Sequence, residues 1–211
     1  MNPNTILLVD DNAEQRRTYV RTLKELLDGC GYTVKPLEPL PSETEYAEIL
    51  ADGEVAALIL DQKMEDGGVP YSGIKLSAYL RSIAPKLPIV ILSNYTENSD
   101  LFVEGEGSVE YIISKGIIGD PTGRDAQVFK ERFLRRLSGF SDLLSDRAQR
   151  YHEFLVKSLK DELTPEEKGE LGLLEEDRVL PQQVCEIQDI NALEMAITEL
   201  KKRIEPTSSS I

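Results

Sequence analysis

Residues suited to phosphate chemistry follow four separate apolar runs in the first half of this 211-residue chain. Asp10 and Asp11 follow the first run, Asp61 the second, Ser93 the third and Lys115 the fourth. Carboxylates gathered in one place repel each other, by roughly 4 kcal/mol for a pair at ~4 Å with an effective dielectric near 20. A divalent cation removes this cost, and oxygen ligands favour a hard ion such as Mg²⁺. Lys115 and Ser93 would then contact phosphoryl oxygens, and Asp61 would be the nucleophile.

The four apolar runs predict strands, because short continuous apolar runs are typical of strands buried on both faces of a parallel sheet. They cover residues 6–9, 56–60, 89–92 and 111–113. The stretches between them have helical periodicity, so the order is β-α-β and the fold class is α/β. In open parallel sheets, sites form where loops leave the carboxyl ends of the strands. We therefore expect the five polar residues to converge in one crevice.

Capping and turn signals place the other elements of this half. A helix over 13–27 stops at Gly29, and residues 32–34 form a short second strand. A capping box, Ser42-Glu43-Thr44-Glu45, opens a helix that runs to Leu50, and a third helix over 73–83 stops before Pro85. A weak helix that residues 98–100 can cap is ended by the glycines of 105–107.

These residues together resemble the receiver domain of two-component response regulators, over about residues 4–137. The motifs that carry the resemblance are Leu8-Val9-Asp10-Asp11-Asn12, Leu60-Asp61-Gln62-Lys63-Met64, Leu92-Ser93 and Ser114-Lys115. The resemblance implies a doubly wound, five-stranded parallel sheet. It implies that Asp61 accepts a phosphoryl group from a histidine kinase or phosphotransfer protein, and that Ser93 and Lys115 sense that group.

The same resemblance implies a cofactor and a role for the protein. Asp11, Asp61 and the backbone carbonyl of Lys63 would bind Mg²⁺ directly, and Asp10 would act through a metal-bound water. A response regulator of this kind is a phosphoacceptor that dephosphorylates only itself, not an enzyme with a separate substrate. It signals through contacts with a downstream effector protein or through a homodimer.

The chain departs from the family pattern at three positions. Glu65 stands where a proline normally follows the methionine, and Gly116 stands where a cis proline normally follows the lysine. Ile112 occupies the position of the switch aromatic, while Tyr111 falls on the opposite face of the strand. We therefore expect phosphorylation chemistry to be retained and the usual signalling face to be altered.

Charge separates the rest of the chain into a basic and an acidic part. Residues 1–124 carry a net charge of −9, residues 125–160 carry +3 and residues 161–211 carry −8, within a total of −14. The basic part has apolar residues at helical spacing over about six turns: Phe133, Leu137, Phe140, Leu144, Ala148, Tyr151 and Leu155. The first half of this stripe should pack on the sheet. The second half requires another surface, which can be a second copy, the C-terminal segment or a different protein.

These patterns predict a receiver-like domain over 1–138, a helical extension over 139–205 and a disordered tail over 206–211. The segment Leu163-Thr164-Pro165-Glu166-Glu167 resembles the start of a LuxR-type helix-turn-helix, but it also fits an ordinary helix start. The segment 191–204 would then be the recognition helix, yet a net charge of −8 over 161–211 opposes DNA binding, and its amphipathic part, 192–204, is expected to pack rather than to read bases. A DNA-binding regulator, a Mg²⁺-dependent phosphatase and a scaffold that is never phosphorylated remain as alternatives.

Other features of the sequence indicate a cytoplasmic protein with no membrane contact. No stretch is long enough to cross a bilayer, and a first strand that begins at Thr5 leaves no room for a signal peptide. Cys30 and Cys185 lack metal or redox spacing and are expected to be reduced thiols. The single histidine, His152, is expected to be exposed on the basic helix.

Overall fold

A six-stranded sheet forms the centre of the molecule. The computed structural model describes residues 3–94, 103–104, 109–175 and 197. The strands lie in the order β2-β1-β3-β4-β6-β5. All pairs are parallel except that of β5 with β6. The strand bounds are β1 Thr5–Val9, β2 Thr33–Leu37, β3 Val55–Asp61, β4 Ile89–Ser93, β5 Val103–Glu104 and β6 Tyr111–Ser114. The predicted five-stranded parallel sheet of an α/β fold is therefore confirmed.

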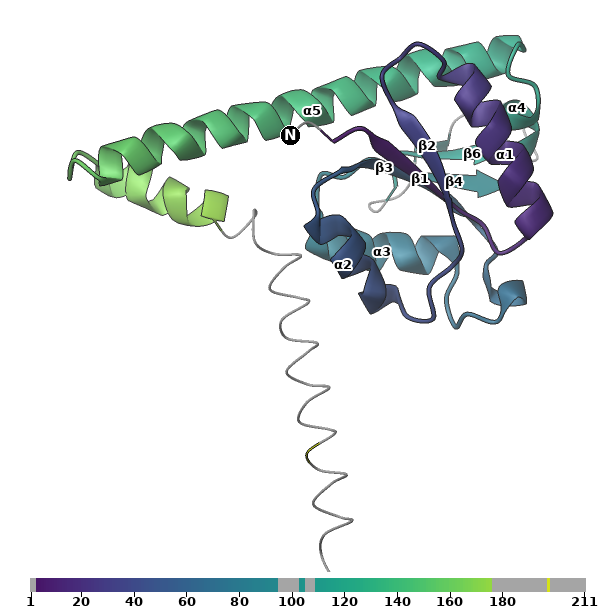
Figure 1. Ribbon diagram of the computed structural model, residues 1–211, viewed down its shortest axis with the longest axis horizontal. Helices are drawn as coiled ribbons and strands as arrows, with labels where there is room; N and C mark the ends of the chain where they lie inside the picture. The colour runs from purple at the N-terminus through teal and green to yellow at the C-terminus, as the bar shows by residue number, and fades with distance from the viewer. Residues whose placement is uncertain (1–2, 95–102, 105–108, 176–196, 198–211) are drawn as a thin grey trace, which may run out of the picture.

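Helices cover both faces of this sheet, which explains the continuous apolar strands (Figure 1). Every residue of β1, β3 and β4 is buried. One face packs against α1 (Ala13–Leu26), α4 (Lys115–Gly119) and the first part of α5 (Arg124–Ser158). The other face packs against α2 (Tyr46–Ala51) and α3 (Gly73–Ile83). Alternate residues of a strand serve opposite faces, so Ile6 and Leu8 belong to the first core and Leu7 and Val9 to the second.

Side-chain caps start the helices in this part. The side chain of Asn12 accepts hydrogen bonds from the backbone N–H groups of Glu14 and Gln15 at the start of α1. The predicted capping box of Ser42 and Glu45 is present, but it opens a 3₁₀ turn, η1 (Glu43–Glu45), which leads into α2. A second 3₁₀ turn, η2 (Glu65–Gly67), follows β3.

The segment before β6 differs from its prediction. The helix predicted from residue 98 to residue 105 is wrong at its end, because Val103–Glu104 pairs as a strand with Tyr111 and Ile112 of β6. Pairing with the sheet edge supplies backbone hydrogen bonds that a short glycine-ended helix cannot match. The rest of that predicted helix lies outside the described residues. So do Cys185, the segment 192–204 apart from Ile197, and the predicted disordered tail 206–211.

Helix α5 runs without interruption for 35 residues and crosses the predicted domain boundary at 138. Its first part is anchored in the core by Ala126, Phe129, Phe133 and Leu137. The later part extends beyond the sheet (Figure 1). Among the described residues, no helix combines the length and apolar character needed to cross a lipid bilayer.

The chain then turns back into a helix over 165–175, which begins as an ordinary capped helix. The Glu167 N–H donates to the hydroxyl of Thr164, and the Thr164 N–H donates to the Glu167 carboxylate. Ion pairs join Lys157 to Glu167 and Arg150 to Glu170. Arg150 precedes Lys157 in α5, but its partner Glu170 follows Glu167, the partner of Lys157. The helix over 165–175 therefore runs antiparallel to the end of α5 (Figure 1).

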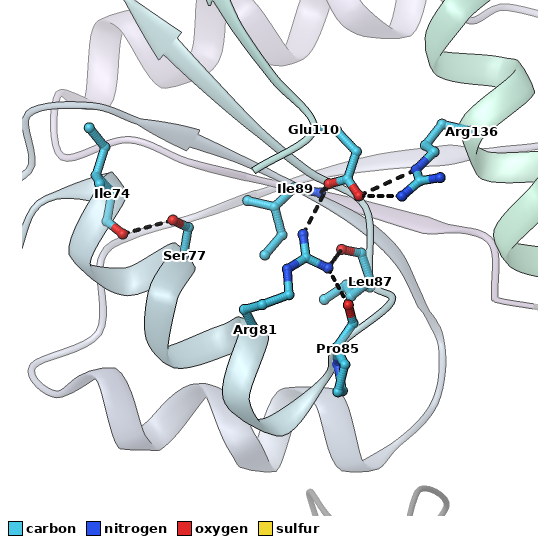
Figure 2. Close-up of polar contacts among 8 residues, drawn as sticks. All are labelled: Ile74, Ser77, Arg81, Pro85, Leu87, Ile89, Glu110 and Arg136. Atoms are coloured by element: carbon cyan, nitrogen blue, oxygen red, sulfur yellow. Dashed lines mark hydrogen bonds and ion pairs between the residues drawn. The ribbon is translucent and has the colours of Figure 1, made fainter. Parts of the chain in front are cut away.

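Glu110, just before β6, joins three elements at the end of the sheet opposite the polar crevice (Figure 2). Its carboxylate accepts the Ile89 N–H at 2.7 Å and pairs with Arg81 of α3 at 3.1 Å. Arg136 of α5 binds the other carboxylate oxygen at 2.8 Å. The Glu110 side chain is only 9% exposed, so this cluster fixes α5 to α3 and β4.

Candidate functional site

The carboxyl ends of the strands bring the predicted polar residues together. Asp10 follows β1, Asp61 is the last residue of β3, and Lys115 begins α4 directly after β6. The Lys115 Nζ atom lies 2.9 Å from Asp61 Oδ1 and 3.5 Å from Asp10 Oδ2. Three positions far apart in the sequence therefore form one buried charge cluster, as the strand-end rule predicts.

Helix α1 supports the Lys115 ammonium group with two residues that the sequence analysis did not identify as site residues. Lys115 Nζ donates to Gln15 Oε1 at 2.8 Å and lies 5.7 Å from the centre of the Tyr19 ring. Gln15 and Tyr19 are four residues apart and so share one face of the helix. The four-residue spacing of Gln15 and Tyr19, in the helix that follows the Asp10-Asp11 pair, is the sequence pattern that could have identified them as site residues.

Asp10, Asp11 and Asp61 form a carboxylate cluster that fits a hard divalent cation. One oxygen from each residue lies within 4.8 Å of the others. Asp10 Oδ1 accepts the Asn12 N–H at 2.8 Å, whereas the buried Oδ2 accepts no hydrogen bond. An oxygen-only donor set with a buried oxygen that still lacks a hydrogen-bond partner is the chemistry that Mg²⁺ or a similar ion satisfies.

A cavity of about 450 Å³ opens beside this cluster. Its lining includes Asp11, Asn12, Gln15, Asp61, Gln62, Lys63, Gly67, Asn94 and Lys115. Ser93 is buried at the end of β4, level with Ser114 of β6 and one residue before Asn94. The backbone N–H of Lys63 donates to the Asp61 carboxylate. The ligand role predicted for the Lys63 carbonyl, and the sensing role of Ser93, stay predictions.

The similarity of this chain to known proteins is a similarity of fold. No protein-family model and no curated protein matches the chain. Among solved structures, a response regulator receiver domain protein from Clostridium thermocellum is 17% identical, with a TM-score of 0.42, over 67% of this chain and 97% of that chain. NtrX from Brucella abortus is 18% identical, with a TM-score of 0.47, over 70% of this chain and 29% of that chain. The lysine decarboxylase LdcF from Francisella novicida is 13% identical, with a TM-score of 0.44, over 67% of this chain and 18% of that chain.

The arrangement of the strands decides the fold type. Counted along the sequence, the parallel strands follow the doubly wound order 2-1-3-4-5. The fold is receiver-like. Its topological switch point lies between β1 and β3, the two strands that deliver Asp10 and Asp61 to the crevice.

Two glycines allow the backbone to approach the receiver-like site closely. A Cβ atom at Gly67 of η2 would lie 2.5 Å from the Cβ atom of Asp11. A Cβ atom at Gly73, which begins α3, would lie 2.2 Å from the Asp61 carbonyl oxygen. Both distances are far below van der Waals contact, so only glycine fits at these positions.

The two departures around β6 have local structural consequences. With glycine at 116, a backbone N–H is available there, and it donates to the Ser114 side chain at 3.3 Å to cap α4. A proline would lack this donor. Tyr111 packs against the core on the α1 and α5 side, and Ile112 packs against the α2 and α3 side. The aromatic residue of β6 therefore faces α5 rather than α3.

Burial sets the protonation behaviour of the cluster. Burial raises the pKa of Asp10 and of Asp61 above 3.8, although Lys115 acts in the opposite direction on both. Burial alone would lower the pKa of Lys115, but its hydrogen bond with Asp61 and the charges of Asp61 and Asp10 raise it above 10.5. The metal-free site therefore stabilises the lysine cation and penalises the two carboxylates.

This balance predicts a pH dependence in the absence of divalent ions. The folded protein holds protons on Asp10 and Asp61 at pH values where the unfolded chain has lost them. Stability from these groups is therefore present below pH 3.8 and lost as the pH rises through their folded-state pKa values. Each unit of pKa shift is equivalent to about 1.4 kcal/mol.

Urea unfolding with EDTA between pH 4 and pH 7, on the wild type and on Asp61→Asn, measures this effect. The amide mimics the protonated acid, so the variant should gain stability relative to the wild type as the pH rises. A stability difference that stays constant, or that falls, would contradict the assigned direction.

Proposed function

We propose that the protein is a response regulator in which Asp61 accepts a phosphoryl group from a histidine kinase or phosphotransfer protein. The carboxylate would attack phosphorus, and the donor histidine nitrogen would leave. The same residue would later return the phosphoryl group to water, so turnover is confined to the protein's own modification. The helical C-terminal part would pass on the change through contact with an effector protein.

One observation carries this proposal. The Asp61 carboxylate ends the central strand β3, borders an open cavity and is held by the Lys115 ammonium at 2.9 Å, beside the carboxylates of Asp10 and Asp11. A phosphoryl group on Asp61 would place new negative oxygens beside the Lys115 cation. Lys115 is thus able to bind the carboxylate before transfer and the phosphoryl oxygens after it.

Mg²⁺ is the proposed cofactor, and Asp10, Asp11, Asp61 and the Lys63 carbonyl would hold it. When bound, it supplies positive charge that neutralises the carboxylates and the phosphoryl oxygens. The Asp10 Oδ2 atom, which accepts no hydrogen bond, and the oxygen-only cluster support this assignment. Gly67, which has no side chain, lets the η2 backbone lie directly beside Asp11.

A transcription regulator that binds DNA through the tail is less well supported. Residues 161–211 carry a net charge of −8, which opposes contact with a phosphate backbone. The start at Thr164 is a complete capping box, the ordinary reason for a helix to begin there. A receiver-like fold by itself does not decide between signalling and enzymatic roles, so the chemistry of Asp61 is the point to test.

Intact-mass measurement after incubation with Mg²⁺ and a phosphodonor tests the proposal. Acetyl phosphate and phosphoramidate are suitable donors, and the second has the nitrogen–phosphorus bond of phosphohistidine. The wild type should gain the mass of one phosphoryl group, and Asp61→Asn should gain none. Asp28→Asn, an exposed aspartate on the surface, is the matched control and should behave as the wild type.

Two outcomes would contradict the proposal. An adduct that persists in Asp61→Asn would remove Asp61 as the acceptor. A folded wild type that stays unmodified with both donors, and with a phosphorylated phosphotransfer protein, would favour an unphosphorylated scaffold.

A further inference from the structure

An apolar groove separates the later part of α5 from the receiver-like body. Its volume is about 750 Å³. On the body side it is lined by Leu50, Val55 and Ile83, and on the α5 side by Leu144, Tyr151 and Leu155. The α5 residues are the second half of the apolar stripe predicted from the sequence, for which a packing surface was expected. Covering such a groove with apolar side chains would remove this surface from water and stabilise the fold.

Basic residues also line this groove. Lys86 precedes β4, and Arg147 and His152 lie on α5 within the lining. The surrounding stretch of chain, residues 125–160, carries a net charge of +3. A complementary occupant would be an amphipathic segment with one apolar face and acidic residues beside it.

The C-terminal part of the chain begins next to this groove. The helix over 165–175 runs back along α5, and Leu174 lines the groove. After residue 175 another 36 residues follow. The 16 residues of 176–191 span up to about 55 Å when extended, which is ample for the next segment to reach any part of the groove.

The segment 192–204 has the apolar pattern that the groove requires. Its apolar residues recur at helical spacing, at Leu193, Ala196, Ile197, Leu200 and Ile204. Within 192–204, the acidic residues Glu194 and Glu199 come before three basic residues, Lys201, Lys202 and Arg203, at the end of the segment. Ile197, the only residue of 192–204 that the structure describes, is helical and 50% exposed, so docking in the groove would bury it further.

We propose that residues 192–204 dock as an amphipathic helix in the groove of the same chain, between α5 and the receiver-like body. The apolar face would cover Leu144, Tyr151 and Leu155, and Glu194 and Glu199 would lie beside the basic residues of the groove lining. A short linker gives the segment an effective concentration in the millimolar range, which a second copy in dilute solution does not reach. The groove is therefore assigned to the chain's own C-terminal segment.

A single tryptophan at position 197 tests this docking, because the chain contains no tryptophan. In full-length Ile197→Trp, the emission should be blue-shifted and protected from iodide compared with the urea-unfolded protein. Adding Ala148→Glu places a bulky negative charge at an exposed position within the groove lining. The emission should then shift to the red, and the iodide quenching constant should rise several-fold.

Ser145→Glu is the matched control, since Ser145 is exposed on the same helix and lies outside the described lining. It should leave the emission unchanged. Hydrogen exchange of 192–204 in the chain without the tryptophan gives an independent measure, with protection expected in the wild type and lost in Ala148→Glu.

Three results would overturn the proposal. The first is a solvent-exposed tryptophan together with unprotected amides in the wild-type segment. The second is equal responses to Ala148→Glu and Ser145→Glu. The third is burial that appears only as protein concentration rises, with a dimer seen by sedimentation, which would give the groove to a second copy.

Discussion

Replacing Lys115 with methionine is expected to lower the free energy of unfolding of the metal-free protein by about 3–5 kcal/mol. The Lys115 side chain is only 6% exposed and pairs with both Asp61 and Asp10. Methionine keeps most of the length of the side chain and removes the charge, which leaves two buried carboxylates without a cation. Urea unfolding at pH 7 in EDTA measures the loss.

Lys75→Met is the matched control for this experiment. Lys75 also pairs with a glutamate, Glu43, but its side chain is 62% exposed, so a loss of about 1 kcal/mol or less is expected. Excess Mg²⁺ should restore part of the stability of Lys115→Met, by about 2.7 kcal/mol at a concentration 100 times the dissociation constant. Equal losses in the two variants would show that Lys115 does not hold the carboxylate cluster together.

Replacing Glu110 with glutamine is expected to lower the free energy of unfolding by about 3 kcal/mol. The carboxylate accepts from the Ile89 N–H and binds Arg81 and Arg136 at once (Figure 2). An amide of the same shape has one acceptor oxygen, so it cannot serve the three donors, and it carries no charge for the two guanidinium groups. Equilibrium urea unfolding gives the value directly.

Glu131→Gln, at an exposed position of α5, serves as the control and should change stability by no more than about 0.5 kcal/mol. A double-mutant cycle with Arg136→Met isolates the share of this free energy that comes from the contact between Glu110 and α5. A coupling energy near zero would mean that Glu110 stabilises α3 and β4 alone.

The convergence of Asp10, Asp61 and Lys115 was predictable because it follows from two local facts and one rule of topology. Each residue stands at the end of an apolar run, and each run is short and flanked by helical stretches. Parallel strands joined by right-handed crossovers then leave little choice about which ends meet. The starts of α1 and α3 were equally predictable, since Asn12 and Ser72 supply side-chain caps that depend on neighbouring residues only.

The other parts depend on contacts between residues distant in sequence, and no local pattern encodes them. Strand β5 exists because the edge of β6 offers unpaired backbone groups, a property of the assembled sheet. Glu110 looked like an ordinary charged residue before a strand, and only packing brings it to Arg81 and Arg136. Gln15 and Gly67 take part in the site through the placement of α1 and η2 against it.

The uninterrupted α5 can act as a lever arm, because its first part is anchored on the sheet and its later part projects from it. From Leu137, the last core residue of the anchored part, to Ser158 the helix extends about 30 Å at 1.5 Å per residue. A tilt of about 6° at the fulcrum therefore moves the far end by about 3 Å. Arg136, bound to Glu110, lies next to that pivot, so a sub-ångström adjustment at the sheet would reach the tip as a displacement comparable to the width of an atom.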